Sequence, residues 1–238
     1  TILLMVKRDT EKQRILQLLR SGHGALRRRD IRLGRTGQRA LADLLNAGDA
    51  QRTAGVIHLP DAPRAIVVCR SFGGVLTAES ALEYYGLPVM RRPREFHIAV
   101  PANTGVIRAP GGVIVHREAH LGRIDPLAMP VASPELILAR MLRRSPEIDA
   151  VAALDAALRE GLVSFEEIRA LLEGDGHQAP TARARLERAN PRSRSLIESR
   201  LRVELEDAGH QVDVGVVVDG VGEVDLLVDR RLFVETDG

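Results

Sequence analysis

A polar segment near the carboxy terminus constrains the fold most, because it interrupts the hydrophobic pattern of the chain. Residues 174–195 read GDGHQAPTARARLERANPRSRS and are rich in Gly, Pro and Arg, with room for a short helix at 181–189. Such a composition is typical of a linker between folded parts. We therefore expect a linker at 177–194, in a chain of 238 residues that suffices for one or two domains of ordinary size.

Composition excludes several classes of protein. Apolar residues occur only in short runs, far below the roughly 18 to 20 that cross a bilayer, so no membrane partner is expected. The single cysteine, Cys69, excludes an internal disulfide and a cysteine-based metal site. No charged and apolar leader is visible, which favours a cytoplasmic location. Aromatic residues make up 3% with no Trp, which argues against base-stacking surfaces and predicts an aliphatic core.

Charge is divided unevenly along the chain. The net charge is only +2, and the 34 basic residues comprise 32 Arg and two Lys. Residues 1–60 carry 12 basic against five acidic residues, whereas residues 198–238 carry four basic against 11 acidic residues. The first end is therefore expected to meet an anionic partner, and the second to be either acidic solvated surface or a carboxylate site for cations.

Three helical segments and a hairpin are expected in the first sixty residues. Residues 9–20 have helical apolar spacing, a short segment follows at 26–31, and a third helix starts near Thr36. The alternating residues 52–60 resemble a short hairpin. Three helices followed by such a wing predict a winged helix-turn-helix at 1–62.

Arginines surround the start of the third helix, where a helix-turn-helix meets DNA. The second helix of such a motif enters the major groove by its amino-terminal end, and flanking arginines contact phosphates. An alternative is a winged helix that contacts protein and carries a solvated arginine surface. The candidate DNA-binding residues are Arg28, Arg32, Arg35, Thr36, Gln38, Arg39 and Arg52.

The middle of the chain, 63–176, is expected to form a small α/β domain. Short β-rich runs separated by Asn, Gly and Pro predict a small antiparallel sheet. Ser164 and Glu167 have the spacing of a capping box. The expected helices are 66–72, 76–85, 133–143, 147–160 and 164–173, and the expected strands are 96–101, 106–108 and 112–117.

The tail, 195–238, is expected to open a further α/β domain. An amphipathic helix at 195–208 would bury Leu196, Ile197, Leu201 and Leu205. Strands at 211–218, 224–228 and 231–236 follow, with turns between them. A domain of this kind should continue beyond the last strand, so the chain is expected to be a fragment.

Four carboxylates in this tail are spaced so that they can converge. Glu198 lies on the helix, Asp225 on one strand, and Glu235 and Asp237 at the end of the next. Convergent carboxylates repel one another unless a hard cation neutralises them, and oxygen ligands suit Mg²⁺ or Mn²⁺. A metal-bound water can cleave a phosphodiester. The alternative is a set of solvated acidic residues at strand ends.

At these positions the chain resembles the PD-(D/E)XK nuclease superfamily, and within it the branch of very-short-patch-repair endonucleases. The blocks are ESRLR at 198–202, GEVDLLV at 222–228 and RRLFVETDG at 230–238. The resemblance implies a truncated restriction-endonuclease-like α/β fold that hydrolyses DNA. It also implies that Asp225, Glu235 and the carbonyl of Thr236 hold Mg²⁺ or Mn²⁺, supported by Glu198. Asp237 stands where most members carry a catalytic Lys.

A second resemblance covers residues 9–173. The run from HGALRRRD to GVIHLP, the block GGVLTAESALEYYGLP, then FHIAVP and ASPELILARM look like AbiEi-type antitoxins of type IV toxin-antitoxin systems. The resemblance implies promoter binding through the winged helix. It leaves room for a toxin partner and a homodimer. Two functions follow for the α+β chain: a metal-dependent DNA endonuclease, or a non-catalytic DNA-binding antitoxin and repressor.

Overall fold

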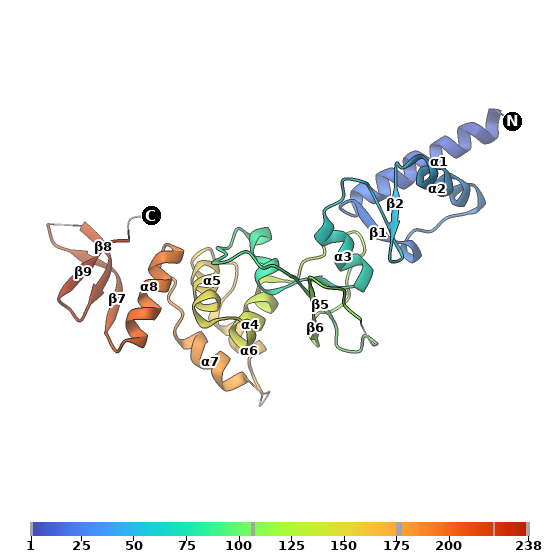
Figure 1. The fold of residues 1–238 in the computed structure, drawn as a ribbon. Helices are drawn as coiled ribbons and strands as arrows, with labels where there is room; N and C mark the ends of the chain where they lie inside the picture. Colours follow the sequence, from blue (N-terminus) through green and yellow to red (C-terminus); the bar gives the residue numbers. More distant parts are fainter. Residues whose placement is uncertain (1, 106–107, 175–177, 221, 237–238) are drawn as a thin grey trace. The chain divides into compact units, whose positions relative to one another are not determined.

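The computed structural model describes residues 2–105, 108–174, 178–220 and 222–236 (Figure 1). The chain forms two compact units. Unit 1 comprises residues 1–76 and 95–131, and unit 2 comprises residues 77–94 and 132–238. Among the described residues, none of the helices combines the length and apolar character needed to span a membrane.

The first part of unit 1 consists of helices and a three-stranded antiparallel sheet in the order β1-β3-β2. Its core is aliphatic, with Ile15, Leu19, Leu44 and Ile57 among its buried members. The elements are α1 (Ile2–Ser21), β1 (Ala25–Arg27), the 3₁₀ turn η1 (Arg28–Asp30), α2 (Arg35–Ala47), β2 (Gln51–Thr53) and β3 (Val56–His58).

Two details in this region differ from the sequence-based expectation. Helix α1 starts at Ile2 rather than near residue 9, because neither Gly nor Pro interrupts residues 2–8. The segment at 26–31 is a strand followed by a single 3₁₀ turn. Leu26 in this segment pairs with Ile57 of β3, a long-range contact that local spacing does not reveal.

The second part of unit 1 is a helix beside another small sheet. The elements are α3 (Arg64–Phe72), β4 (Val75–Leu76), β5 (Phe96–Pro101) and β6 (Val113–Glu118). Strand β5 pairs antiparallel with β4 but parallel with β6, which corrects the expectation of an antiparallel sheet. Strands β5 and β6 run in the same direction, so a crossover connection must join them. In the strand expected at 106–108, Val106 and Ile107 lie outside the described residues.

The helix expected at 76–85 is absent. Leu76 instead pairs with Ile98 of β5, and Ala78 has φ +49°, which a right-handed helix does not accommodate. Two 3₁₀ turns follow, η2 (Ala78–Ser80) and η3 (Leu82–Tyr85).

In its described residues, unit 2 contains five helices. All five lie within two residues of their predicted limits, and the capping box is confirmed, since Ser164 and Glu167 each bond the other's backbone N–H. The helices are α4 (Pro134–Arg144), α5 (Glu147–Arg159), α6 (Phe165–Leu171), α7 (Ala179–Glu187) and α8 (Leu196–Asp207).

Helix α7 lies within the segment that was expected to be a linker. Ala182 and Leu186 are fully buried. Arg185 Nη1 donates to the carbonyls of Leu142 and Ser145 at 2.9 and 3.0 Å, at the end of α4. Arginines that bond the last carbonyls of a helix stabilise its end. The arginine-rich composition therefore reflects helix-end contacts inside unit 2, and the short helix expected at 181–189 is present as α7.

Helix α8 buries a different face from the predicted one. Glu198, Ser199, Arg202 and Val203 are buried, whereas Ile197 is 49% exposed. The buried face is polar because Arg202 forms an ion pair with Asp155 of α5.

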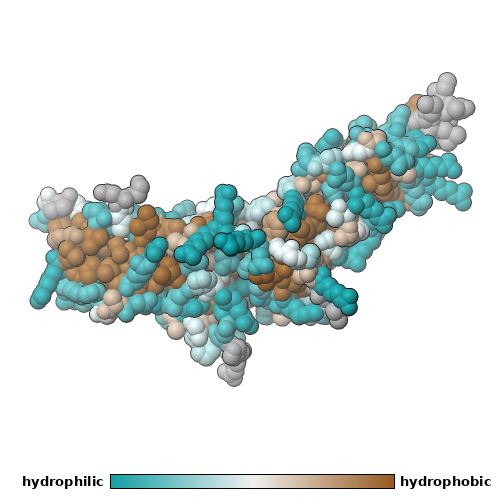
Figure 2. Space-filling view, in the orientation of Figure 1, coloured by the Kyte–Doolittle hydropathy of each residue, from teal (hydrophilic) through white to brown (hydrophobic). Residues whose placement is uncertain are grey.

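The tail folds as an antiparallel sheet with the strand order β7-β8-β9. The strands are β7 (Val212–Val218), β8 (Gly222–Val228) and β9 (Leu232–Val234). Val224 and Leu226 are buried, whereas Val217, Leu232 and Phe233 are exposed. Figure 2 shows apolar surface over this sheet.

Candidate functional site

The amino-terminal end of α2 presents polar side chains to solvent. Arg35, Gln38 and Arg39 are exposed, and Thr36 is half-buried. Gly37 between them is buried, and a Cβ there would lie 2.8 Å from Glu11 Oε2 and 3.1 Å from Leu33 Cδ2. Glycine thus lets α2 lie close to α1 and the preceding loop. No acidic residue occupies the first turn of α2.

The only carboxylate of α2, Asp43, is engaged by α1. Arg8 pairs with it, and Lys12 Nζ lies 3.5 Å from its other oxygen. The hydrogen bond from Arg8 holds the pKa of Asp43 below its usual value. In the part of the chain that the structure describes, no carboxylate pairs with Arg35 or Arg39. The start of α2 therefore keeps its positive charge.

The other predicted DNA contacts surround this helix. Arg32 and Arg52 are exposed, the first in the loop before α2 and the second on β2. Arg28 is half-buried, and its Nη1 donates to the carbonyl of Ile31 at 2.9 Å. Arg28 is therefore partly occupied in holding the turn before α2.

Asp225 and Thr236 are brought together by the tail sheet. Leu226 pairs with Val234, so Asp225 and Glu235 occupy the next facing positions. Asp225 Oδ2 accepts hydrogen bonds from Thr236 N at 2.8 Å and from Thr236 Oγ1 at 2.9 Å. The Thr236 N–H, helped by its hydroxyl and the charge of Arg194, holds the pKa of Asp225 below its ordinary value.

Glu198 is buried and already has backbone partners. Its Oε2 accepts a hydrogen bond from Arg194 N at 2.8 Å, and its own N–H donates to Ser195 Oγ at 3.0 Å. Arg194 in turn pairs with Glu223 of β8. Ser195 therefore caps the start of α8, and the buried Glu198 carboxylate holds the backbone of Arg194 just before it.

The tail carboxylates that were predicted to bind a metal do not come together as a metal site in the described residues. Within residues 2–105, 108–174, 178–220 and 222–236, no group of three His, Cys, Asp or Glu side chains is placed to hold a metal ion. Asp237, the fourth predicted carboxylate, lies outside the described residues. One oxygen of Asp225 is also taken up by Thr236. The described residues alone do not fit a Mg²⁺ or Mn²⁺ site.

A buried polar cluster joins α5 to α8 and escaped the sequence analysis. Arg202 Nη2 lies 2.8 Å from Asp155 Oδ2, and the two side chains are 2% and 1% exposed. Ser199 Oγ donates to the same oxygen at 2.8 Å, and Asn190 N donates to Oδ1 at 2.6 Å. The only available signal was a charged residue within an apolar run, Asp155 in AALDAAL.

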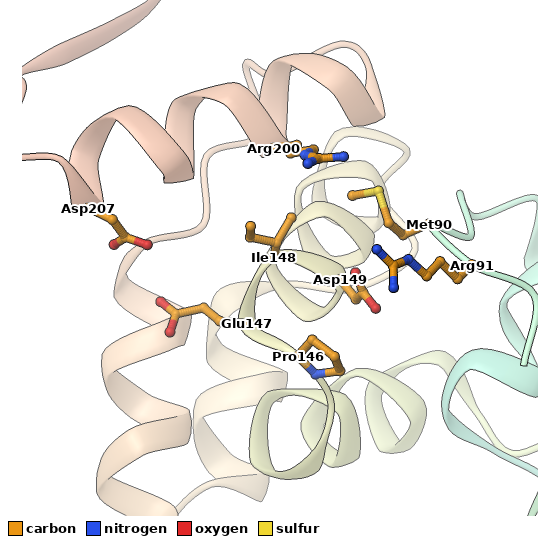
Figure 3. Close-up of a pocket in the computed structure, with 8 residues that line it drawn as sticks. All are labelled: Met90, Arg91, Pro146, Glu147, Ile148, Asp149, Arg200 and Asp207. Atoms are coloured by element: carbon orange, nitrogen blue, oxygen red, sulfur yellow. The ribbon is translucent and has the colours of Figure 1, made fainter.

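Unit 2 also has a pocket of about 390 Å³ between the start of α5, α8 and residues 90–91. Its walls mix apolar and charged side chains. Arg91 and Asp149 turn toward each other in Figure 3, and Arg200 reaches the pocket from α8. Burial, together with Glu79, raises the pKa of Asp149. The lining carries two arginines and three carboxylates, so both signs of charge meet in this pocket.

The central part of the chain is similar to a known protein family. Residues 73–187 match the family model of the AbiEi antitoxin C-terminal domain. No curated protein matches the chain. The crystal structure of the RV2827C protein from Mycobacterium tuberculosis is similar at 20% identity, over 87% of this chain and 84% of that one, with a TM-score of 0.42.

Proposed function

We propose that this protein is a DNA-binding antitoxin that represses transcription in a toxin–antitoxin system. The match of residues 73–187 to the AbiEi antitoxin C-terminal domain supports the antitoxin assignment. That match favours the non-catalytic function over the endonuclease.

The amino-terminal part of unit 1 supports DNA binding. Its order, α1, β1, a 3₁₀ turn, α2 and the β2–β3 hairpin, with the sheet order β1-β3-β2, resembles a winged helix-turn-helix in which the 3₁₀ turn stands in place of the middle one of the three expected helices. The observation that carries the proposal is the start of α2, where Arg35, Gln38 and Arg39 are exposed and no acidic residue lies in the first turn.

These side chains have the chemistry of base and phosphate recognition. An arginine can donate two hydrogen bonds to the O6 and N7 of guanine, and a glutamine can form a bidentate pair with adenine. Arg32 and Arg52, exposed on either side, would contact phosphates, which position the protein on DNA without reading its sequence.

The test places a reporter gene under the control of the DNA that lies upstream of the gene for this chain. It measures whether the protein represses that reporter. We expect wild-type protein to repress and to protect a discrete stretch of that DNA from nuclease digestion. Arg35→Ala/Arg39→Ala should lose both effects.

The matched control is Arg92→Ala/Arg169→Ala, which removes two exposed, ion-paired arginines from unit 2. Equal repression by wild type and Arg35→Ala/Arg39→Ala would contradict the assignment to α2. The toxin partner is tested separately, by asking whether this protein restores growth to cells that express a candidate toxin.

A further inference from the structure

We propose that a hollow beside the β2–β3 turn binds a phosphate group of the DNA backbone; this rests on the proposed function. The hollow has a volume of about 410 Å³ and lies within unit 1. It is lined by Arg27, Arg28, Arg29, Ala54, Gly55 and Ser71.

Strand pairing places the arginines beside the turn. Arg27 pairs with Val56 across β1 and β3, and Arg28 N donates to the carbonyl of Gly55 at 2.8 Å. Three consecutive arginines therefore run along one side of the turn formed by Ala54 and Gly55. Ser71 of α3 supplies the opposite wall.

The Arg27 side chain is held in place on the protein. Its Nε donates to the carbonyl of Arg70 at 2.7 Å. A Cβ at Gly73 would lie 2.4 Å from both Nη atoms of Arg27, so glycine at this position makes room for the guanidinium. The side chain is therefore ordered before any ligand arrives, which reduces the entropy lost on binding.

Positive charge in the hollow is not neutralised by its lining. The lining residues include three arginines and no acidic residue. Arg29 Nε lies 4.0 Å from Asp30 Oδ1, which is a weak ion pair. Burial first, and then the charges of Arg29 and Arg70, lower the pKa of Arg27. An anion in the hollow would relieve this repulsion.

A phosphodiester suits these donors. Guanidinium groups bind phosphate oxygens through paired hydrogen bonds, and arginine is favoured where such planar recognition matters. Ser71 Oγ already donates to the carbonyl of Val68 at 2.8 Å, so the cations provide the attraction. The position beside the turn of the expected wing favours a backbone phosphate over a free one.

A pair of substitutions at Ala54 tests the hollow with little risk to folding. Ala54 has φ +47° and is exposed, and Asn and Asp tolerate this left-handed conformation better than most residues. Ala54→Asp adds a negative charge to the lining, whereas Ala54→Asn has nearly the same shape without the charge. Thermal unfolding should show equal stability for the two variants.

We expect Ala54→Asp to weaken binding of a DNA duplex about tenfold and to reduce the salt slope by about one, relative to Ala54→Asn. If the two variants bind DNA with equal affinity and equal salt slope while wild type still binds DNA, the assignment of the hollow as a phosphate site is overturned, and the proposed function is not. Wild type that binds no duplex would overturn the proposed function itself.

Inorganic phosphate serves as the second probe, titrated into both variants and followed by NMR shifts of the Arg27 and Arg29 amides. A contrary result is that phosphate shifts these amide signals in Ala54→Asn but not in Ala54→Asp, while both variants bind DNA equally. That result would mean that the hollow binds free phosphate, and it would overturn the proposal that it binds a phosphate of the DNA backbone.

Discussion

The Arg202–Asp155 ion pair shows how the stability of the fold can depend on each member of a buried charge pair keeping its partner. Both side chains are almost completely buried, and burial raises the pKa of Asp155 while Arg202 opposes that change. A buried ion pair contributes little net stability compared with apolar residues, but removal of one partner leaves an uncompensated charge.

We therefore expect Asp155→Asn to lower the free energy of unfolding by about 3 to 5 kcal/mol. Urea denaturation followed by circular dichroism measures the change. Arg200→Ala is the control, because Arg200 is an exposed residue of α8 that forms an ion pair with its exposed neighbour Glu204. A loss below about 1 kcal/mol for Asp155→Asn would contradict the buried ion pair.

Asp225 gives a prediction about pH. Its folded pKa is depressed, chiefly by the Thr236 N–H, so its contribution to stability is present above the ordinary carboxyl pKa and is lost as pH falls through the folded value. Thr236→Val removes the hydroxyl donor and keeps the backbone donor. We expect the pKa of Asp225, followed by carboxyl ¹³C shifts, to move part of the way back; an unchanged pKa would show that the hydroxyl contributes nothing.

Cys69 should be chemically inert in the folded protein. The side chain is fully buried, and burial raises the pKa of its thiol to about 12. Only the thiolate reacts readily with alkylating reagents. We expect no labelling at pH 8 without denaturant and complete labelling in denaturant, measured by mass spectrometry; rapid labelling of the native protein would place Cys69 at the surface.

At the scale of elements, local sequence patterns predicted which helices and strands exist better than they predicted which elements pack or pair with one another. Helices α4 to α6 could be predicted because Pro134 and the Ser164–Glu167 box mark their starts. The parallel pairing of β5 with β6 could not, because it depends on where residues 102–112 carry the chain.

The buried face of α8 illustrates the same limit. Hydrophobic spacing selected Leu196 and Ile197, but the ion pair of Arg202 with Asp155 decides the orientation. Such a partner lies 47 residues away in sequence, beyond the reach of any periodicity. For the candidate site, the exposed arginines of α2 could be predicted, whereas the role of Arg27 required the register of β1 with β3.

The tail elements permit a direct test of the endonuclease prediction. Among the described residues, no three of these carboxylates gather as a metal site, and Glu198 accepts a hydrogen bond from Arg194 N. The antitoxin proposal, which rests on the family match of residues 73–187, predicts no Mg²⁺- or Mn²⁺-dependent cleavage of duplex or single-stranded DNA. Cleavage that disappears in both Asp225→Asn and Glu235→Gln would contradict this expectation and establish the nuclease.

At the scale of the whole molecule, the near-neutral net charge conceals a functional division. The basic excess of residues 1–60 remains available at α2, because the acid of that helix is paired with α1. Several acidic residues of the tail are engaged within the protein, Glu198 and Asp225 by backbone N–H groups and Glu204, Glu206 and Glu223 by arginines.

Homodimer formation stays a prediction at this scale. If two copies bind together, nuclease protection should reveal two half-sites about one helical turn, roughly 34 Å, or a multiple of it apart. A single protected stretch of DNA, together with a monomeric protein in analytical ultracentrifugation, would indicate that one copy binds alone.

The salt dependence of DNA binding tests the central claim most directly. The affinity of wild type for a duplex from its own upstream region should fall steeply as salt rises, because each phosphate contact releases counterions. Arg35→Ala/Arg39→Ala should bind more weakly, with a slope of log K against log salt shallower by about one to two. An unchanged affinity and slope in this variant would contradict DNA binding through α2.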